Sequence, residues 1–262
     1  MLVYDEFLLQ CKITIKFLVV KLFWLIFCHV SIAFWLKMTL FYMLSCRNDI
    51  VTGHGSCIYL MGLCIKFMKN YVDVAARNMK RAAELVESLG LVEQWRKIGA
   101  DVNLIGSFAT GLLMKHLDID LHVYTDVLSV RDSFAAVAGI ASHKGVRHVV
   151  FSDLSYTEEA CFEWHLTYRD TDGRDWTVDM IHILRGSAFD GFAENMARRI
   201  SEVLTDETRD TILRLKYETP DGMHISGPQY YAAVLSDGVR DYEGLVAWIG
   251  KHRDDDLINW LP

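Results

Sequence analysis

The hydrophobic positions along the chain change their spacing several times, and each spacing predicts a type of element. Between residues 71 and 89, apolar residues recur every three or four positions and Gly90 follows, so this segment is predicted to be an amphipathic helix. The helix is expected to pack one face on the rest of the protein. The residues on that face are Met79, Ala82, Ala83, Val86 and Leu89.

Shorter runs with strand-like patterns follow this helix. Residues 100–105 form a brief apolar run that ends at Gly106-Ser107, and residues 119–124 alternate apolar and polar side chains after a short helix-like stretch. Residues 162–168 and 176–183 alternate in the same way, with Asp172-Gly173 between them. The last two runs are therefore predicted to form a β-hairpin.

The remaining segments complete an α+β pattern. Residues 129–142 are predicted to be helical, and residues 146–151 are predicted to be a strand entered through Gly145. After Asp190 the spacing is helical again, in segments 192–203, 208–217, 229–235 and 242–249. We therefore expect an α+β fold, in which a small mixed β-sheet with flanking helices precedes a C-terminal helical bundle.

The first 67 residues differ in composition from the rest of the chain. They hold five of the six cysteines and an apolar run from residue 17 to 36, which has about the length of a membrane span but is interrupted by Lys21 and His29. This leader is open to three interpretations: a membrane anchor, a secretory signal, or an extension outside the working protein, whose natural start is then Met68. We favour the last.

Charge separates the same two parts. The leader has 6 basic and 3 acidic residues, so the remainder has 27 − 6 = 21 basic and 34 − 3 = 31 acidic residues, a balance of −10. Because general nucleic-acid affinity comes from neutralising phosphates with Lys and Arg, we expect no strong general nucleic-acid binding. Small anionic substrates held through metal ions are compatible with this charge.

One short stretch, IGSFATGLLMKHLDIDLHVY, combines two features that chemistry can use together. Asp118 and Asp120 are two positions apart in a predicted strand, so both carboxylates leave the same face, where their repulsion favours a bound cation. Gly106 allows a tight turn, and Ser107 opens the next helix, where a phosphate is readily bound. A triphosphate and two carboxylates require metal ions between them, so each feature supports the other.

Gly106-Ser107, ten residues, and then Asp118-Ile119-Asp120 resembles the signature of the nucleotidyltransferase superfamily typified by DNA polymerase beta. The resemblance covers roughly residues 101–183. It implies metal-dependent transfer of a nucleoside monophosphate from a nucleoside triphosphate, such as ATP, to an acceptor by two-metal in-line attack, with Mg²⁺ or Mn²⁺ as cofactor. It also implies that Gly106 and Ser107 bind the nucleotide, and that Asp118 and Asp120 are catalytic metal ligands.

The family supplies a third carboxylate from a later strand. The best match is Asp179, in the second arm of the predicted hairpin, which we therefore assign to catalysis and metal binding with Asp118 and Asp120. Asp153 and Glu163 are weaker alternatives. Many family members have a small hydroxyl residue before the first aspartate, but this chain has Leu117 there. The resemblance therefore does not assign the substrate.

For several other polar or aromatic residues we prefer an ordinary structural role to a functional one. His122 and His182 are expected to be structural, the latter because it faces away from Asp179 in a regular strand. The charged residues that could contact phosphate are expected to be solvated, and the two aromatics that could stack on a base are expected to be core. These residues are Lys115, Arg174, Arg185, Lys216, Tyr230 and Tyr231.

These observations divide the chain into a leader (1–67), a nucleotidyltransferase domain (68–188) and a C-terminal helical region (189–262). We expect a cytoplasmic enzyme, attached to a membrane if the leader is an anchor. The acceptor is a small molecule, a protein or a nucleic-acid end. One alternative is a catalytically silent nucleotide-binding or partner-binding module on the same fold, which a large separation of Asp179 from Asp118 and Asp120 would favour. Another is a membrane-attached sensor.

Overall fold

The computed structural model describes residues 54–253, 257 and 260–262. The apolar run at 17–36 lies outside these residues, so its three interpretations stay as predictions. Among the described residues, no helix is both long and apolar enough to cross a membrane. Lys66–Pro262 form one compact unit, and the architecture below is that of this unit.

Five strands form one mixed sheet in the order β1-β2-β5-β4-β3. The strands are β1 (Asp101–Ile105), β2 (Asp118–Thr125), β3 (Val146–Asp153), β4 (Cys161–Arg169) and β5 (Asp175–Leu184). Only β2 and β5 pair in parallel, and the other neighbours are antiparallel. The predicted α+β class with a mixed sheet is confirmed, and so is the hairpin, since β4 and β5 pair from Arg169 and Asp175 at the turn outward.

One face of the sheet is covered by the C-terminal part of α3 (His54–Ser88), by α4 (Leu91–Arg96) and by α6 (Val130–Ala141). The alternation of the strands explains this core, because Ile119, Leu121 and Val123 are fully buried on this face while the polar residues between them are not. Three tryptophans fill the same layer: Trp95, Trp164 and Trp176. Aromatic side chains of this kind each bury about 150–250 Å² and dominate the energetics of a core.

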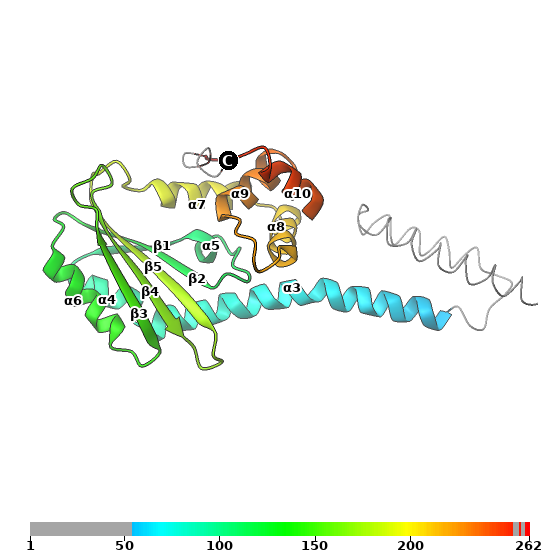
Figure 1. The fold of residues 1–262 in the computed structure, drawn as a ribbon, viewed down its shortest axis with the longest axis horizontal. Coiled ribbons are helices and arrows are strands. Elements are labelled where there is room, and N and C mark those ends of the chain that lie inside the picture. Colours follow the sequence, from blue (N-terminus) through cyan, green and yellow to red (C-terminus); the bar gives the residue numbers. More distant parts are fainter. Residues whose placement is uncertain (1–53, 254–256, 258–259) are drawn as a thin grey trace, which may run out of the picture. The chain divides into compact units, whose positions relative to one another are not determined.

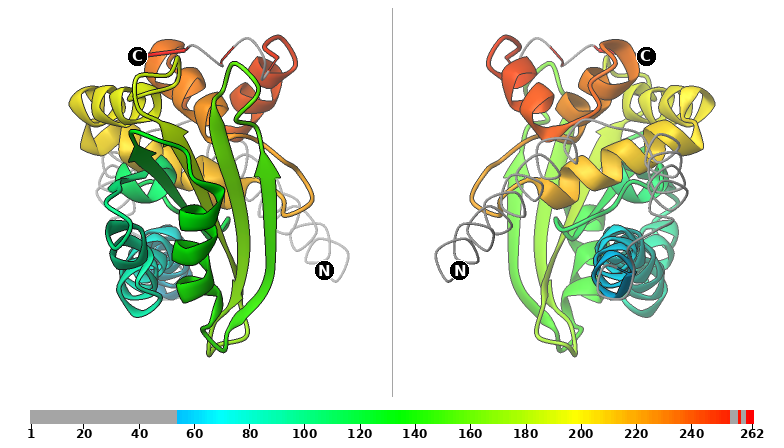
Figure 2. Two further views of the ribbon diagram at one scale, coloured as in Figure 1. Left: turned by 90° about the vertical axis from the view of Figure 1, so that its left-hand side faces the viewer. Right: turned by 90° about the vertical axis from the view of Figure 1, so that its right-hand side faces the viewer.

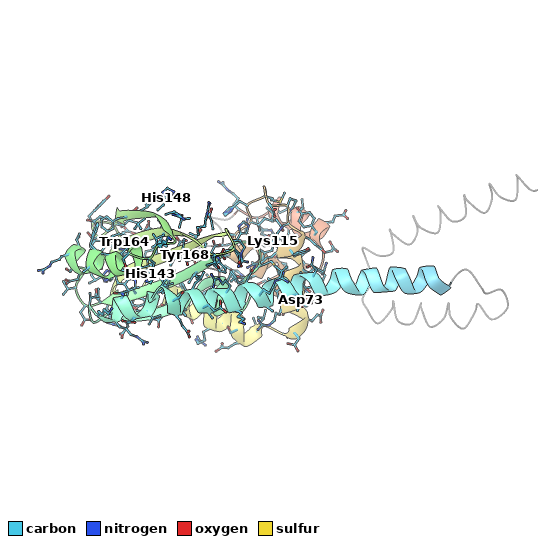
Figure 3. All side chains as sticks on the ribbon, turned by 90° about the horizontal axis from the view of Figure 1, so that it is seen from below. Asp73, Lys115, His143, His148, Trp164 and Tyr168 are labelled. Carbon is cyan, nitrogen blue, oxygen red and sulfur yellow. The ribbon has the colours of Figure 1, made fainter. Side chains whose placement is uncertain are left out.

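The predicted helix at 71–89 lies within α3, but its buried stripe differs from the prediction at two positions. Ala83 is exposed and Leu85 is buried in its place, between Ala82 and Leu89. The period of 3.6 residues allows either position on the edge of the stripe, and the larger side chain faces the core. Figure 3 shows α3 running along the unit beneath the sheet. The short helix α4 was not predicted.

The segments after Asp190 are helical as expected. They form α7 (Phe192–Val203), α8 (Asp206–Glu218), α9 (Gly227–Tyr231), the π-helix η1 (Ala232–Ser236) and α10 (Tyr242–Ile249). Capping boxes at Thr205 and Ser226 start α8 and α9. The helices from α8 onward are grouped together, away from α4 and α6 (Figures 1 and 2). They share a second core with Tyr71 and Ala75 of α3, so α3 packs into both cores.

Candidate active site

Two neighbouring strands bring together the three aspartates named from the sequence. Asp118 and Asp120 lie on one face of β2, because the residues between and after them, Ile119 and Leu121, point into the core. The parallel pairing of β2 with β5 places Asp179 directly opposite Asp120. The strands of Asp120 and Asp179 therefore lie side by side, as expected, although 179 − 120 = 59 positions separate these residues.

The electrostatics of this cluster show carboxylates held together against their own repulsion. Burial raises the pKa of Asp120 to about 7, and the charges of Asp118 and Asp179 act in the same direction. Burial also raises the pKa of Asp118, with a further contribution from Asp179. Lys216 opposes both shifts. The site is therefore a place where a cation is favoured.

Gly106 forms the turn that faces Asp120. Its φ of +65° lies in the left-handed region, and a Cβ at this position would stand 2.0 Å from Oδ2 of Asp120. Glycine is required here for both reasons, because a side chain would be strained and would occupy the space of the carboxylate. Gly106 is also the first residue of the four-residue helix α5 (Gly106–Ala109).

Lys216 of α8 reaches the same turn. Its Nζ donates to the hydroxyl of Ser107 at 3.1 Å, to the hydroxyl of Tyr231 at 3.1 Å and to the carbonyl of Leu112 at 3.0 Å. The Ser107 and Tyr231 hydroxyls are themselves 3.3 Å apart. Expecting Lys216 to be merely a solvated charge was therefore wrong, since this ammonium is part of a polar cluster at the glycine turn.

Tyr230 and Tyr231 are both buried, in agreement with the core interpretation, but only one of them touches the turn. The Tyr230 hydroxyl donates to Thr219 at 2.7 Å, within the second core. Tyr231 combines a buried ring with a hydroxyl at Ser107. Segment 229–235 was predicted to be helical from the spacing of its apolar residues. That spacing does not show whether the hydroxyl of a tyrosine in the helix faces the core or a functional site.

Three other candidate cations are engaged elsewhere. Lys115 contacts Asp221 at 2.8 Å, in the loop between α8 and α9. Arg174 donates to Asp170 in the β4–β5 turn. Arg185 bonds to Asp126 and Asp101, beyond the end of β2 that is distant from Asp118. These contacts hold loops in place, and none of them involves the three aspartates.

Two histidines that the sequence did not single out lie near Asp118. His116 precedes β2 and His224 belongs to the loop between α8 and α9, and their ring centroids are 6.4 Å apart. Both oppose the rise in the pKa of Asp118, which places positive potential beside that carboxylate. Loops far apart in sequence bring them together, so local spacing could not reveal them.

The weaker alternatives for the third carboxylate differ in position. Asp153 ends β3, two strands away from β5, and accepts from the hydroxyl and amide of Ser155. Glu163 lies on β4, which does adjoin β5, and its partner residue in the pairing is Ile181 rather than Asp179. The residue of β4 opposite Asp179 is His165, whose Nδ1 lies 2.7 Å from Oδ1 of Asp179.

The two histidines expected to be structural are both held by other side chains. His182 is fully buried on the core face, between Thr125 and Ser133, and burial lowers its pKa to about 4. His122 shares the face of Asp118 and Asp120, but its Nδ1 contacts the hydroxyl of Tyr124 at 3.2 Å and the carboxylate of Glu194 at 3.6 Å.

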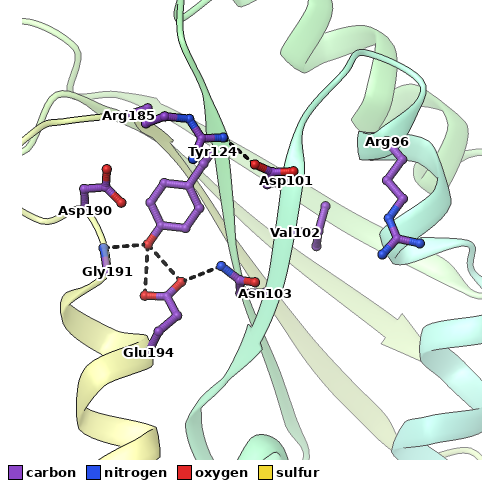
Figure 4. A pocket seen from close by; sticks show the side chains of 9 residues that line it. All are labelled: Arg96, Asp101, Val102, Asn103, Tyr124, Arg185, Asp190, Gly191 and Glu194. Atoms are coloured by element: carbon purple, nitrogen blue, oxygen red, sulfur yellow. Dashed lines mark hydrogen bonds and ion pairs between the residues drawn. The ribbon is translucent and has the colours of Figure 1, made fainter.

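A separate surface hollow of about 480 Å³ lies at the other end of β2 (Figure 4). The Tyr124 hydroxyl donates to both oxygens of Glu194, at 2.9 and 3.0 Å, and Asn103 donates to the same carboxylate. Burial alone would raise the pKa of Glu194, but hydrogen bonds from His122 and Tyr124 outweigh this effect and lower the pKa to about 2. This cluster fastens α7 to β1 and β2 and contains none of the predicted site residues.

The aspartate cluster fits a hard divalent cation by its donor chemistry. Among the described residues, no three Asp, Glu, His or Cys side chains are arranged as a ready coordination shell. Mg²⁺, however, is usually held by one or two carboxylates together with substrate phosphates and water, so a complete protein shell is not required. Asp118 and Asp120 provide such a pair, and Asp179 stands opposite it.

Comparisons with known proteins found matches among solved structures. Two structures of the Cid1 poly(U) polymerase have TM-scores of 0.46 and 0.47 at 18% and 19% identity, and the match covers 65% of this chain and 55% and 54% of those chains. A structure of the GLD-2–GLD-3 non-canonical poly(A) polymerase complex has a TM-score of 0.42 at 13% identity, over 62% of this chain and 53% of that chain. This chain thus spans about half the length of these proteins. No protein-family model and no curated protein matches the chain.

Proposed function

We propose that this chain is a metal-dependent nucleotidyltransferase of the DNA polymerase beta-like superfamily, which transfers a nucleoside monophosphate from a nucleoside triphosphate to an acceptor. The observation that carries the proposal is the pairing of Asp120 with Asp179 across β2 and β5, with Asp118 on the same face and the Gly106 turn in contact with Asp120. Each part alone has an ordinary structural explanation. Their meeting at one place supports a site.

The chain's own residues supply a place for the triphosphate. The Ser107 hydroxyl is a donor at the glycine turn, and the Lys216 ammonium, 3.1 Å from it, offers a positive charge for the phosphates. Tyr231 accepts a hydrogen bond from Lys216 and so holds the ammonium against the turn.

Asp118, Asp120 and Asp179 are the residues that would hold Mg²⁺ or Mn²⁺. When bound, the cations would stabilise the attacking and leaving oxygens of an in-line displacement. In that displacement the acceptor oxygen forms a bond to the α-phosphorus, the bond from this phosphorus to the pyrophosphate oxygen breaks, and the acceptor proton is lost to solvent. Burial, together with the charges of Asp118 and Asp179, raises the pKa of Asp120 to about 7, and a nearby cation would favour its ionised form.

The catalytically silent module is less favoured than the enzyme. A large distance between Asp179 and the other two aspartates would have favoured the silent module. These residues instead lie on paired strands. A module that only bound a partner would also have no use for three carboxylates that repel one another on one face.

The test is transfer activity of the full chain. Each of the four common nucleoside triphosphates is incubated with Mg²⁺ or Mn²⁺ and a library of small hydroxyl compounds, proteins and RNA ends, and pyrophosphate release is measured. We expect release that depends on both the cation and one acceptor class. Asp118→Asn, Asp120→Asn and Asp179→Asn are each expected to lower turnover by at least about 10²-fold, the scale of losing a group that stabilises transition-state charge.

Asp153→Asn is the matched control. It removes one carboxylate from the same sheet, two strands away from β5, and is expected to leave turnover unchanged. Undiminished cation-dependent turnover of Asp179→Asn would remove Asp179 from the mechanism and make Glu163 the next residue to test. A full chain that binds nucleotide but releases no pyrophosphate with any acceptor would favour the silent module.

A further inference from the structure

A histidine faces the third aspartate from the neighbouring strand. His165 of β4 is the pairing partner of Asp179 of β5, and its Nδ1 lies 2.7 Å from Oδ1 of the carboxylate. The other ring nitrogen, Nε2, lies 3.8 Å from Oε2 of Glu163, two positions earlier on the same strand and the same face. The imidazole therefore stands between two carboxylates.

We propose that His165 is a positioning residue that fixes the carboxylate of Asp179 for metal binding. The inference rests on the proposed function, because it assigns to Asp179 the role of a ligand. No local pattern distinguishes His165, which is one of ten histidines and lies 14 positions from Asp179.

The geometry explains what such a residue adds. Strand pairing fixes the Cα of Asp179 opposite that of Asp120, but the carboxylate still rotates about two side-chain bonds. A hydrogen bond from Nδ1–H uses one lone pair of Oδ1 and selects one orientation. The second oxygen, Oδ2, has no hydrogen-bond partner within the described part of the chain, and it keeps its full capacity as a ligand.

The contact with Glu163 orients the imidazole ring of His165. A carboxylate beside Nε2 favours the ring orientation in which Nδ1 faces Asp179, in the way that outer carboxylates orient metal-site histidines.

The contact between His165 and Asp179 is expected to contribute little to the stability of the fold. The side chains of His165 and Asp179 are 45% and 31% exposed, and exposed ion pairs of this kind contribute about 0–1 kcal/mol to folding. Removing the imidazole is therefore expected to leave the fold intact, so that a change in metal affinity can be read without a change in stability.

A histidine that competes with the cation would have the opposite effect on metal affinity. If the imidazole competes with the cation for Asp179, then removing it strengthens metal binding. If it positions the carboxylate, removing it weakens metal binding, and a donor at the same place restores it. Asparagine is such a replacement, because its Nδ2 lies close to the position of Nδ1 in histidine.

The experiment measures Mn²⁺ alone, by the loss of the free-ion signal in electron paramagnetic resonance, on the full chain and its His165→Ala, His165→Asn and Asp179→Asn variants. We expect His165→Ala to weaken Mn²⁺ binding by about 10–100-fold, the range found for outer partners of metal ligands, and His165→Asn to recover most of that loss. Asp179→Asn marks the affinity without the third carboxylate. Thermal unfolding of every variant in chelator is expected to agree with the native chain.

His148→Ala is the control for loss of an exposed imidazole. His148 lies on the edge strand β3, opposite Thr167 of β4, and is labelled in Figure 3. It is expected to bind Mn²⁺ as the native chain does. Unchanged or tighter binding by His165→Ala, or failure of His165→Asn to restore binding while folded, overturns the positioning role alone. A native chain that binds no Mn²⁺ overturns this inference alone, because the proposed function allows a cation held together with substrate phosphates and is tested separately by pyrophosphate release.

Discussion

The contact between Gly106 and Asp120 can be tested by adding a single methyl group. In Gly106→Ala the new Cβ would stand 2.0 Å from Oδ2 and 2.8 Å from Cγ of Asp120, far inside van der Waals contact. The backbone at Gly106 has a φ of +65°, which a residue with a Cβ rarely adopts. The substitution therefore has two costs, one in the backbone and one in the displaced carboxylate.

The two costs have different sizes and can be separated. The left-handed conformation costs an alanine about 1–2 kcal/mol. Forcing the carboxylate out of its place costs about 1–3 kcal/mol more, as overpacking of a fitted site does. Gly106→Ala is thus expected to lower the free energy of unfolding by about 2–5 kcal/mol. Gly173 has a φ of +78° with nothing within 4 Å of its Cβ position, so Gly173→Ala has only the backbone cost.

The assay is urea unfolding of the full chain in chelator, followed by circular dichroism. Gly106→Ala is measured alone and together with Asp120→Ala, which removes the two atoms nearest the methyl group, Oδ2 and Cγ, and leaves only Cβ, at 3.2 Å. In the double variant the cost of Gly106→Ala should fall to that of Gly173→Ala, so the coupling energy is about 1–3 kcal/mol. Equal costs at Gly106 and Gly173, or no coupling with Asp120, would refute the close fit between the turn and the carboxylate.

The other predictions concern the nucleotide, acidity and the leader. Ser107→Ala and Lys216→Met are each expected to weaken Mg²⁺-dependent triphosphate binding by about 1.5–3 kcal/mol in calorimetry, because each removes a charge-assisted hydrogen bond; equal affinity with and without chelator contradicts this. Burial lowers the pKa of His182 from 6.5 to about 4, so the unfolded chain takes up a proton first as the pH falls. The free energy of unfolding should drop by roughly 3 kcal/mol between those pH values, and His182→Gln should flatten the drop. A chain that starts at Met68 should be soluble and unfold cooperatively, and its aggregation beside a folded, active full chain would contradict this.

Local pattern was sufficient for the strands that carry the aspartates. The alternation around Asp118 and Asp120 predicted their common face, because side chains of a strand alternate whatever the partner is. The turn at Asp172-Gly173 predicted the hairpin of β4 and β5. The parallel pairing of β2 with β5 had no local signal in the sequence, and it is this pairing that places Asp179 opposite Asp120.

The residues that sequence reasoning missed are those whose role depends on a distant partner. Lys216 and Ser107 are 109 positions apart, and the helical spacing of α8 is the same whether its lysine faces solvent or the turn. His165 is a polar residue in an alternating strand, as any exposed strand residue would be. The short helix α4 is stabilised by Leu91 and Trp95, which are buried against the sheet, and six residues are too few for a helical period to stand out.

The double packing of α3 also bears on the order in which the protein can fold during synthesis. Ala82 and Leu89 meet partners in strands that follow within about a hundred residues, whereas the Tyr71 hydroxyl donates to Asp210, 139 positions later. At 5–20 residues per second, the ribosome needs roughly 7–30 s to make that stretch. The apolar side of Tyr71 and Ala75 meets Leu112 and Met114 early, but it lacks its partners from α8 onward through that interval. A nascent chain of this protein is expected to expose part of an apolar helical surface for seconds, and exposed surface of this kind is what chaperones protect.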